Sequence, residues 1–244
     1  IPLTAFALLE GRNKISRMSK REITILSIVF IALTIVIFRP IKNNNQSAKL
    51  NDYGVALETK GFLDEAIEHY KKALNAPPVH RRAALNLALA YYQKKDTDKA
   101  IEFSKKALKI DEKFVEARLF LASILYAQKN FTTASEHYKE ILKEEPNNEK
   151  AHSQLGGIYL FTKKFSLAEE EFRLSLKYSK SPARAYNNLG MVYLGQGKFE
   201  QAKEYFNNAL KHNPDLVEAN YNLGTVFKLQ GFPDKAQKFF QTTK

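Results

Sequence analysis

The chain has 244 residues, and its 38 basic and 26 acidic residues give a formal net charge of +12. It contains no cysteine, which excludes disulfides and thiolate metal sites and leaves the redox compartment open. The first 46 residues hold seven Lys or Arg and two Asp or Glu. Basic runs farther along, such as Tyr70-Lys71-Lys72, are expected to face solvent rather than nucleic acid.

Residues 1–20 form a basic N-terminal segment, and residues 21–40 are predicted to form a transmembrane helix. Residues 23–38 carry no charge, and most of them are Ile, Leu, Val or Phe. As a helix they would span ~24 Å. That is close to the ~30 Å hydrocarbon layer of a bilayer, and snorkelling basic residues at both ends can extend the span. A buried helix would need an apolar partner segment, and a cleaved signal peptide would end in small residues rather than in the Arg39-Pro40 that follows here.

More basic residues precede this apolar run than follow it. Those that precede it are Arg12, Lys14, Arg17, Lys20 and Arg21, whereas Arg39 and Lys42 follow it closely. Because an excess of basic residues stays on the cytoplasmic side, we expect a cytoplasmic N-terminus. Everything after the run would then lie on the outer side, which is periplasmic, lumenal or extracellular. Residues 41–46 form a short polar linker.

From residue 47 onward, small residues recur with a period of 34 residues. The later of two such positions is always alanine: Ala66, Ala100, Ala134, Ala168, Ala202 and Ala236. Twelve residues earlier comes Gly54, Ala88, Ala122, Gly156, Gly190 or Gly224. This period predicts a stack of identical helical hairpins, in which each unit buries its apolar face against the next. The small residues let two helix axes approach to ~8 Å.

Segments such as YNNLGMVYLGQGKFEQAKEYFNNALKHNP, from Tyr186 to Pro214, closely resemble the tetratricopeptide repeat family. The resemblance covers residues 47–244. It implies an all-α fold, a right-handed α-solenoid of helix–turn–helix repeats, here preceded by one transmembrane helix. The predicted repeats are 47–80, 81–114, 115–148, 149–182, 183–216 and 217–244. The last repeat ends without a polar capping helix, so its edge is expected to meet a continuation of the chain or another molecule, including a second copy.

No catalytic residue, cofactor or metal site is predicted, and no small-molecule substrate is evident. The five histidines lack metal-ligand spacing and are expected at surface positions: His69, His80, His137, His152 and His212. The glycines of the GMVYLGQGKF segment are not followed by the Lys-Ser/Thr of a phosphate-binding loop. Since nothing beyond the solenoid would form a pocket, the chain as given is predicted not to be an enzyme.

The resemblance implies that the first helices line a concave groove, with repeat positions 2, 6, 9 and 13 facing into it. Position 6 is a carboxamide in four of the six repeats: Asn86, Gln154, Asn188 and Asn222. A carboxamide offers a donor and an acceptor, which matches one peptide unit. The ladder is similar to the asparagine ladder of O-linked N-acetylglucosamine transferase, which grips peptides without reading their sequence. An alternative stays open, in which these asparagines serve only the local geometry of the repeats.

Charged and aromatic side chains complete the expected groove. Position 2 forms a rim of mixed charge whose cations are Arg82, Lys150 and Arg184. The aromatic anchors are Tyr92, Phe120, Tyr126, Phe161 and Tyr221. The first helices lack the set of Lys and Arg with which related adaptors hold the carboxylate of a chaperone tail, so that function is excluded.

The predicted function is that of a membrane-anchored scaffold that binds a protein or peptide segment in its groove. The alternative is the non-catalytic C-terminal tail of a membrane glycosyltransferase, where the repeats would present acceptor proteins. The layout of an apolar span followed by repeats is similar to that of dolichyl-phosphate-mannose-type enzymes. A start codon at Met18 would favour the scaffold, whereas a long upstream reading frame rich in spans would favour the transferase.

Overall fold

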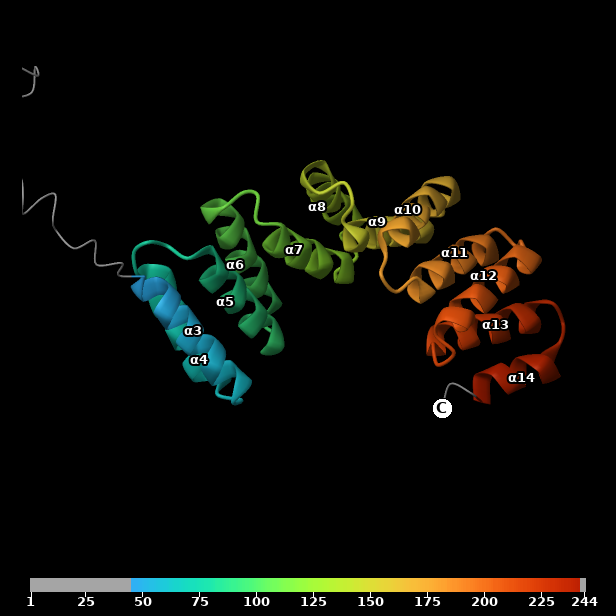
Figure 1. Ribbon diagram of the computed structural model, residues 1–244, viewed down its shortest axis with the longest axis horizontal. Helices are drawn as coiled ribbons and strands as arrows, with labels where there is room; N and C mark the ends of the chain where they lie inside the picture. The colour runs from blue at the N-terminus through green and yellow to red at the C-terminus, as the bar shows by residue number, and fades with distance from the viewer. Residues whose placement is uncertain (1–44, 242–244) are drawn as a thin grey trace, which may run out of the picture. The chain divides into compact units, whose positions relative to one another are not determined.

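The computed structural model describes residues 45–241, and these residues form twelve α-helices and no strand (Figure 1). The helices are arranged as six hairpins. The first helices of the hairpins are α3 (Gln46–Thr59), α5 (Arg81–Gln93), α7 (Val115–Ala127), α9 (Glu149–Phe161), α11 (Ala183–Gly195) and α13 (Val217–Leu229). The second helices are α4 (Leu63–Asn75), α6 (Thr97–Ile110), α8 (Phe131–Glu144), α10 (Phe165–Tyr178), α12 (Phe199–His212) and α14 (Pro233–Gln241). The expected all-α solenoid is confirmed for this part of the chain.

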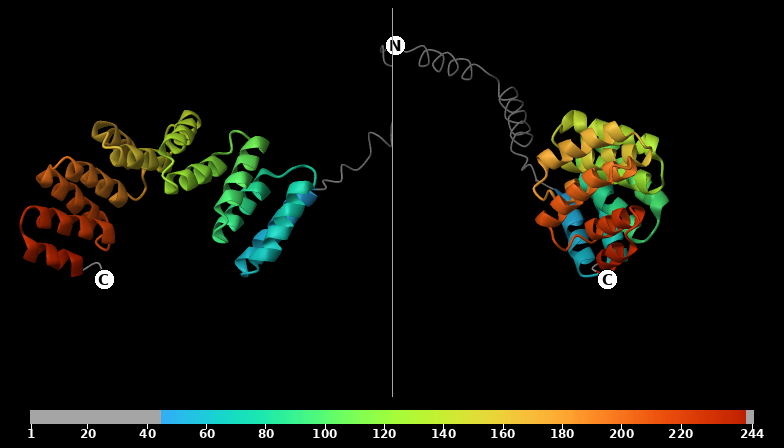
Figure 2. Two further views of the ribbon diagram at one scale, coloured as in Figure 1. Left: turned by 180° about the vertical axis from the view of Figure 1, so that it is seen from behind. Right: turned by 90° about the vertical axis from the view of Figure 1, so that its right-hand side faces the viewer.

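The hairpins stack in chain order (Figures 1 and 2). Each helix packs against the helices that precede and follow it, and α3–α5, α9–α11 and α11–α13 also contact each other directly. From α5 to α13, the first helices begin at residues 34 apart, which is the period of the small residues in the sequence. Each hairpin is therefore stabilised mainly by its immediate neighbours.

The turn inside every hairpin contains one residue with a positive φ angle. These residues are Gly61, Lys95, Lys129, Lys163, Gly197 and Gly231. The left-handed conformation lets the next backbone N–H reach back to the end of the first helix, as Lys198 N does to Tyr193 O at 2.9 Å. Glycine adopts this conformation without strain, whereas a side chain costs roughly 1–2 kcal/mol there.

Small residues on the first helices pack directly against rings on the second helices. A Cβ atom added to Gly190 would lie 2.5 Å from Cε1 of Phe206, a side chain that is fully buried. Gly54, Gly156 and Gly224 meet Tyr70, Phe172 and Phe240 in the same way. In the second hairpin, Ala88 takes the small position and Ser104 takes the place of the ring. The Ser104 hydroxyl is buried and donates to Ala100 O at 2.7 Å, so its polar group is satisfied.

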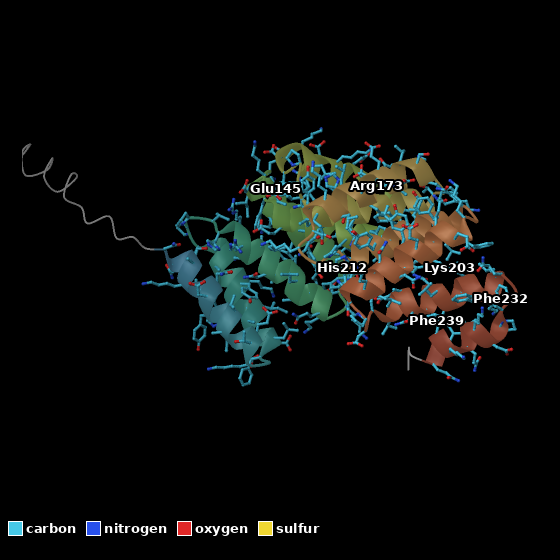
Figure 3. All side chains as sticks on the ribbon, turned by 45° about the vertical axis from the view of Figure 1, so that its right-hand side comes forward. Glu145, Arg173, Lys203, His212, Phe232 and Phe239 are labelled. Atoms are coloured by element: carbon cyan, nitrogen blue, oxygen red, sulfur yellow. The ribbon has the colours of Figure 1, made fainter. Side chains whose placement is uncertain are left out.

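A polar cluster joins α10 to the next hairpin. Glu169 Oε1 accepts from Arg173 Nη2 at 2.7 Å and from the Tyr193 hydroxyl at 2.8 Å (Arg173 is labelled in Figure 3). Arg173 also reaches the Tyr205 hydroxyl at 3.2 Å, and the rings of Tyr193 and Tyr205 stack with centroids 5.0 Å apart. Burial opposes ionisation of Glu169, but the hydrogen bonds from Tyr193 and Arg173 outweigh it and lower the pKa of this carboxyl. Burial and the bond to Glu169 raise the pKa of Tyr193 to about 12.

His152 differs from the sequence prediction, which placed all five histidines at the surface. Its side chain is only 5% exposed. Its Nδ1 lies 2.7 Å from Glu171 Oε2, and its Nε2 lies 2.9 Å from Pro146 O. His152 is the fourth residue of α9 and contacts both the second helix of its own hairpin and the loop from the preceding hairpin. The predicted surface position is therefore wrong for His152.

The predicted transmembrane helix at residues 21–40 and the basic segment at residues 1–20 lie outside the described residues. Between Gln46 and Gln241, no helix is both long enough and apolar enough to cross a bilayer.

We predict that Gly190→Ala destabilises the fold by about 1–3 kcal/mol, because the new methyl group collides with the buried ring of Phe206. The same change in an unobstructed helix interior would stabilise by about 1 kcal/mol. Gly157→Ala in α9 is the matched control, since its Cβ would lie 3.3 Å from the hydroxyl at the tip of Tyr126. Urea unfolding of the two variants compares them directly, and equal stability would contradict the packing described here.

We predict that Glu169→Gln lowers the free energy of unfolding by about 1 kcal/mol at pH 7. Since folding lowers the pKa of Glu169 below its ordinary value of 4.5, its contribution is fully present above that pH. The difference between variant and wild type should shrink as the pH falls below 4.5. Glu170→Gln, which changes an exposed carboxylate on the same helix, is the control. A difference that persists undiminished at pH 3.5 would show that the ionised carboxylate is not its source.

Candidate binding groove

A groove with a volume of ≈ 1140 Å³ runs along the first helices of the third to sixth hairpins. Residues from α7, α9, α11 and α13 line it. They are Glu116, Leu119, Phe120, Ser123, Glu149, Lys150, Ser153, Gln154, Arg184, Asn187, Asn188, Met191, Val217, Glu218, Tyr221 and Asn222, together with Leu216 and Tyr138. Most of them are the second, fifth, sixth or ninth residue of a first helix, which the helical period places on one face. Stacking in register then aligns these faces into a continuous surface.

The sixth-position asparagines form hydrogen bonds between hairpins. Asn222 Nδ2 donates to Asn187 Oδ1 at 2.9 Å, and Asn188 Nδ2 donates to Ser153 Oγ at 3.4 Å. Both asparagines are partly buried in the groove. Within the described residues, no hydrogen bond is made to the Oδ1 atom of either side chain. Each carboxamide therefore joins the stack through one N–H, and its oxygen accepts no hydrogen bond from the described residues.

The charges along the rim partly compensate one another. Lys150 and Arg184 line the groove together with Glu116 and Glu218. Arg82 lies beyond the lining, and its Nη2 is 3.4 Å from Glu116 Oε1. Both partners of this pair are more than half exposed, so the pair contributes little to stability. The rim is mixed in charge, as the sequence indicated.

The expected aromatic anchors separate into two groups. Phe120 and Tyr221 line the groove, and Tyr221 is 56% exposed. Tyr92 stands edge-on to Phe120, with ring centroids 5.6 Å apart. Tyr126 and Phe161 both contact the ring of Phe131 at the start of α8, with centroid distances of 5.5 and 4.6 Å. This second cluster lies near the turns inside the hairpins and does not line the groove.

Of the twelve predicted groove residues, seven line the cavity: Phe120, Lys150, Gln154, Arg184, Asn188, Tyr221 and Asn222. The other five do not: Arg82, Asn86, Tyr92, Tyr126 and Phe161. Asn86 belongs to the second hairpin, where its Nδ2 donates to Asn51 Oδ1 at 2.9 Å. The sequence interpretation missed the fifth-position residues Leu119, Ser153 and Asn187. The sequence could have identified them, because each stands 35 residues before a sixth-position residue of the next repeat, and stacked repeats bring such residues side by side.

The groove is lined by neutral polar, apolar and scattered charged side chains. Within residues 45–241, no group of three or more His, Asp or Glu side chains is placed to hold a metal ion. This lining is suited to contacting another chain by hydrogen bonds and apolar contacts.

Comparisons with known proteins agree with this architecture. Three family models described as tetratricopeptide repeat match residues 52–113, 125–189 and 183–216. No curated protein sequence matches the chain. The matches confirm that the chain contains tetratricopeptide repeats, as the sequence resemblance implied, and the chain is a helical repeat protein.

Solved structures show the same fold at low sequence identity. A tetratricopeptide repeat protein from Parabacteroides merdae aligns with a TM-score of 0.73 and 19% identity, over 80% of this chain and 77% of that one. PilW, described as a type IV pilus biogenesis factor, aligns with a TM-score of 0.69 and 20% identity, over 79% and 90%. YrrB, described as having an unusual peptide-binding site, aligns with a TM-score of 0.57 and 18% identity, over 72% and 91%. At such identities the likeness concerns the fold alone.

Proposed function

We propose that the chain is a non-catalytic scaffold that binds an extended protein segment in the groove along α7, α9, α11 and α13. One observation carries the proposal. Asn188 and Asn222 lie on adjacent first helices, each held by a bond through its own nitrogen, and each retains its oxygen for a ligand. A carboxamide in that state can accept from a backbone N–H and donate to a backbone C=O of a bound segment.

The surroundings of the asparagines favour binding in two ways. Phe120, Met191 and Tyr221 offer apolar contact area along the same groove. Met191 and Tyr221 are 37% and 56% exposed, so they are accessible to a partner. The bonds to Ser153 and Asn187 fix the carboxamides before binding, which reduces the entropy lost when a ligand binds.

The known proteins give this proposal indirect support. The description of YrrB names a peptide-binding site, and that of PilW names a role in pilus biogenesis. Both statements concern those proteins, and they make a binding role on this fold a reasonable proposal for the present chain. None of the solved structures reported above is described as a glycosyltransferase, so the alternative of a glycosyltransferase tail has no support among them.

We further propose that residues 21–40 anchor the scaffold in a membrane, with the repeats on the outer side. The uncharged run at residues 23–38 and the excess of basic residues before it support this proposal. The chain should stay in the membrane pellet after carbonate extraction, and protease added from outside should cleave the repeats. Release into the soluble fraction would contradict the anchor, and protection of the repeats would reverse the orientation.

We predict that Asn188→Ala combined with Asn222→Ala lowers the affinity for a bound segment about 10-fold or more. Each lost hydrogen bond is worth roughly 0.5–1.5 kcal/mol. The probe is a peptide selected by the wild-type full chain from a displayed random library, and its affinity is measured by fluorescence anisotropy. The variant should also be somewhat less stable, because both asparagines bond to the preceding hairpin.

Asn220→Ala is the matched control for this prediction. Asn220 lies on α13 but outside the groove lining, and its Nδ2 is 3.4 Å from Pro214 O. It should change stability without changing peptide affinity. Unaltered affinity in the Asn188 and Asn222 double variant would place the partner on another surface.

A further inference from the structure

The three inter-hairpin asparagine bonds follow one rule. In each, the residue at position 6 of a repeat donates to the residue at position 5 of the preceding repeat, 35 positions earlier in the sequence, with positions counted from the predicted repeat starts 47, 81, 115, 149, 183 and 217. The pairs are Asn51–Asn86, Ser153–Asn188 and Asn187–Asn222. In every case the fifth-position residue supplies an oxygen that can accept the bond.

The remaining two junctions have a leucine at the fifth position, which cannot accept a hydrogen bond, and neither is followed by asparagine. At the junction of the second and third hairpins, Leu85 is followed by Phe120, and the two residues belong to one apolar cluster. At the next junction, Leu119 is followed by Gln154, which is exposed. A fifth-position residue that can accept a hydrogen bond is thus always followed by asparagine at the next sixth position, whereas leucine is followed once by Phe120 and once by Gln154.

Contacts between neighbouring first helices also differ between the junctions with polar pairs and the junctions with a fifth-position leucine. The first helices contact each other more extensively across the junctions α3–α5, α9–α11 and α11–α13, which carry the polar pairs. At the α5–α7 junction, the rings of Tyr92 and Phe120 stand between the helices. Small polar pairs allow a closer approach at those three junctions, whereas the rings of Tyr92 and Phe120 occupy the α5–α7 junction.

We propose that this fifth–sixth residue pair determines specificity at each junction of the groove. A polar pair fixes a carboxamide for gripping peptide backbone, and at the apolar pair Leu85–Phe120 the ring of Phe120, which packs against the core and lines the groove, is the seat for an apolar side chain. Ser153 and Asn187 are accordingly positioning residues, which act through Asn188 and Asn222. The inference rests on the proposed function and specifies its partner as an extended segment, gripped at α11 and α13, with a large apolar side chain at α7.

The dimensions of the stack give the position of that side chain. Helices α7 and α11 are two hairpins apart, which is at least roughly 20 Å, since even packed helices lie ~8–10 Å apart. An extended chain covers this distance in about six residues, at ~3.3 Å each. The apolar residue of the partner should therefore lie about six positions from the part whose backbone is gripped.

The proposal can be tested by moving a fifth–sixth residue pair from one junction to another. Each pair already occurs in this chain at the equivalent positions of another repeat. The variant Asn187→Leu/Asn222→Phe copies the Leu85–Phe120 pair into the last junction. The variant Leu85→Asn/Phe120→Asn copies the Asn187–Asn222 pair into the second. Each full-chain variant, with wild type alongside, is used to select peptides from the same displayed random library, and the enriched sequences are compared.

The wild type should enrich peptides with one large apolar position and little preference elsewhere. The Asn187→Leu/Asn222→Phe variant should gain a second apolar position, about nine residues from the first, since three hairpins separate the two seats. The Leu85→Asn/Phe120→Asn variant should lose the apolar preference. Enriched sequences identical to those of wild type in both variants would overturn the inference while leaving the proposed function intact.

A stability measurement accompanies the selection. Asn187→Leu alone leaves Asn222 without its acceptor, and Asn222→Phe alone sets a ring against a polar side chain. Each single variant should therefore unfold at a lower urea concentration than the double variant. Independent, additive effects would show that the two residues are not coupled, and would overturn the rule. If the wild type enriches no peptide family, the proposed function fails, and the inference fails with it.

Discussion

The structure depends on the contact between a small residue on the first helix of a hairpin and a large side chain on the second, a contact that a glycine makes in four of the six hairpins. Gly190 has no space for even one methyl group against Phe206, and Gly54, Gly156 and Gly224 are equally confined. This close approach sets how the two helices of a hairpin cross and which of their faces remain for the neighbouring hairpin. Because a small residue recurs at this position every 34 residues, equivalent faces of the helices meet at every junction. A solenoid follows from local packing repeated in register.

The register aligns the first helices so that equivalent residues lie side by side along the groove. The asparagine at position 6 then reaches the residue at position 5 of the hairpin before it, as Asn222 reaches Asn187. One side chain thereby joins two hairpins and, in the proposed function, also contacts the bound segment. Under that proposal stability and binding are coupled, since a ligand that bonds to Asn188 and Asn222 would reinforce the stack at its last two junctions.

The sequence predicted the elements that depend on residues within one hairpin. The small-residue period located the contact of Gly190 with the second helix, and the resemblance to tetratricopeptide repeats implied that Phe120, Asn188 and Asn222 lie in the groove, which they line. Contacts between a helix and a neighbouring hairpin were not predicted. His152 is buried by a loop from the preceding hairpin, and Phe161 turns toward Phe131 instead of the groove. The spacing within one helix does not specify such contacts, since they depend on how far apart neighbouring hairpins lie.

Hydrogen–deuterium exchange of the full chain, with and without a peptide selected by the wild type, tests the central claim most directly. If the partner lies along the first helices, binding should slow backbone exchange in α9, α11 and α13, because the ligand stabilises these helices against local opening. Exchange at the solvent-facing ends of α8, α10 and α12 should change far less. Slowed exchange in those second helices, with α9, α11 and α13 unaffected, would contradict the account.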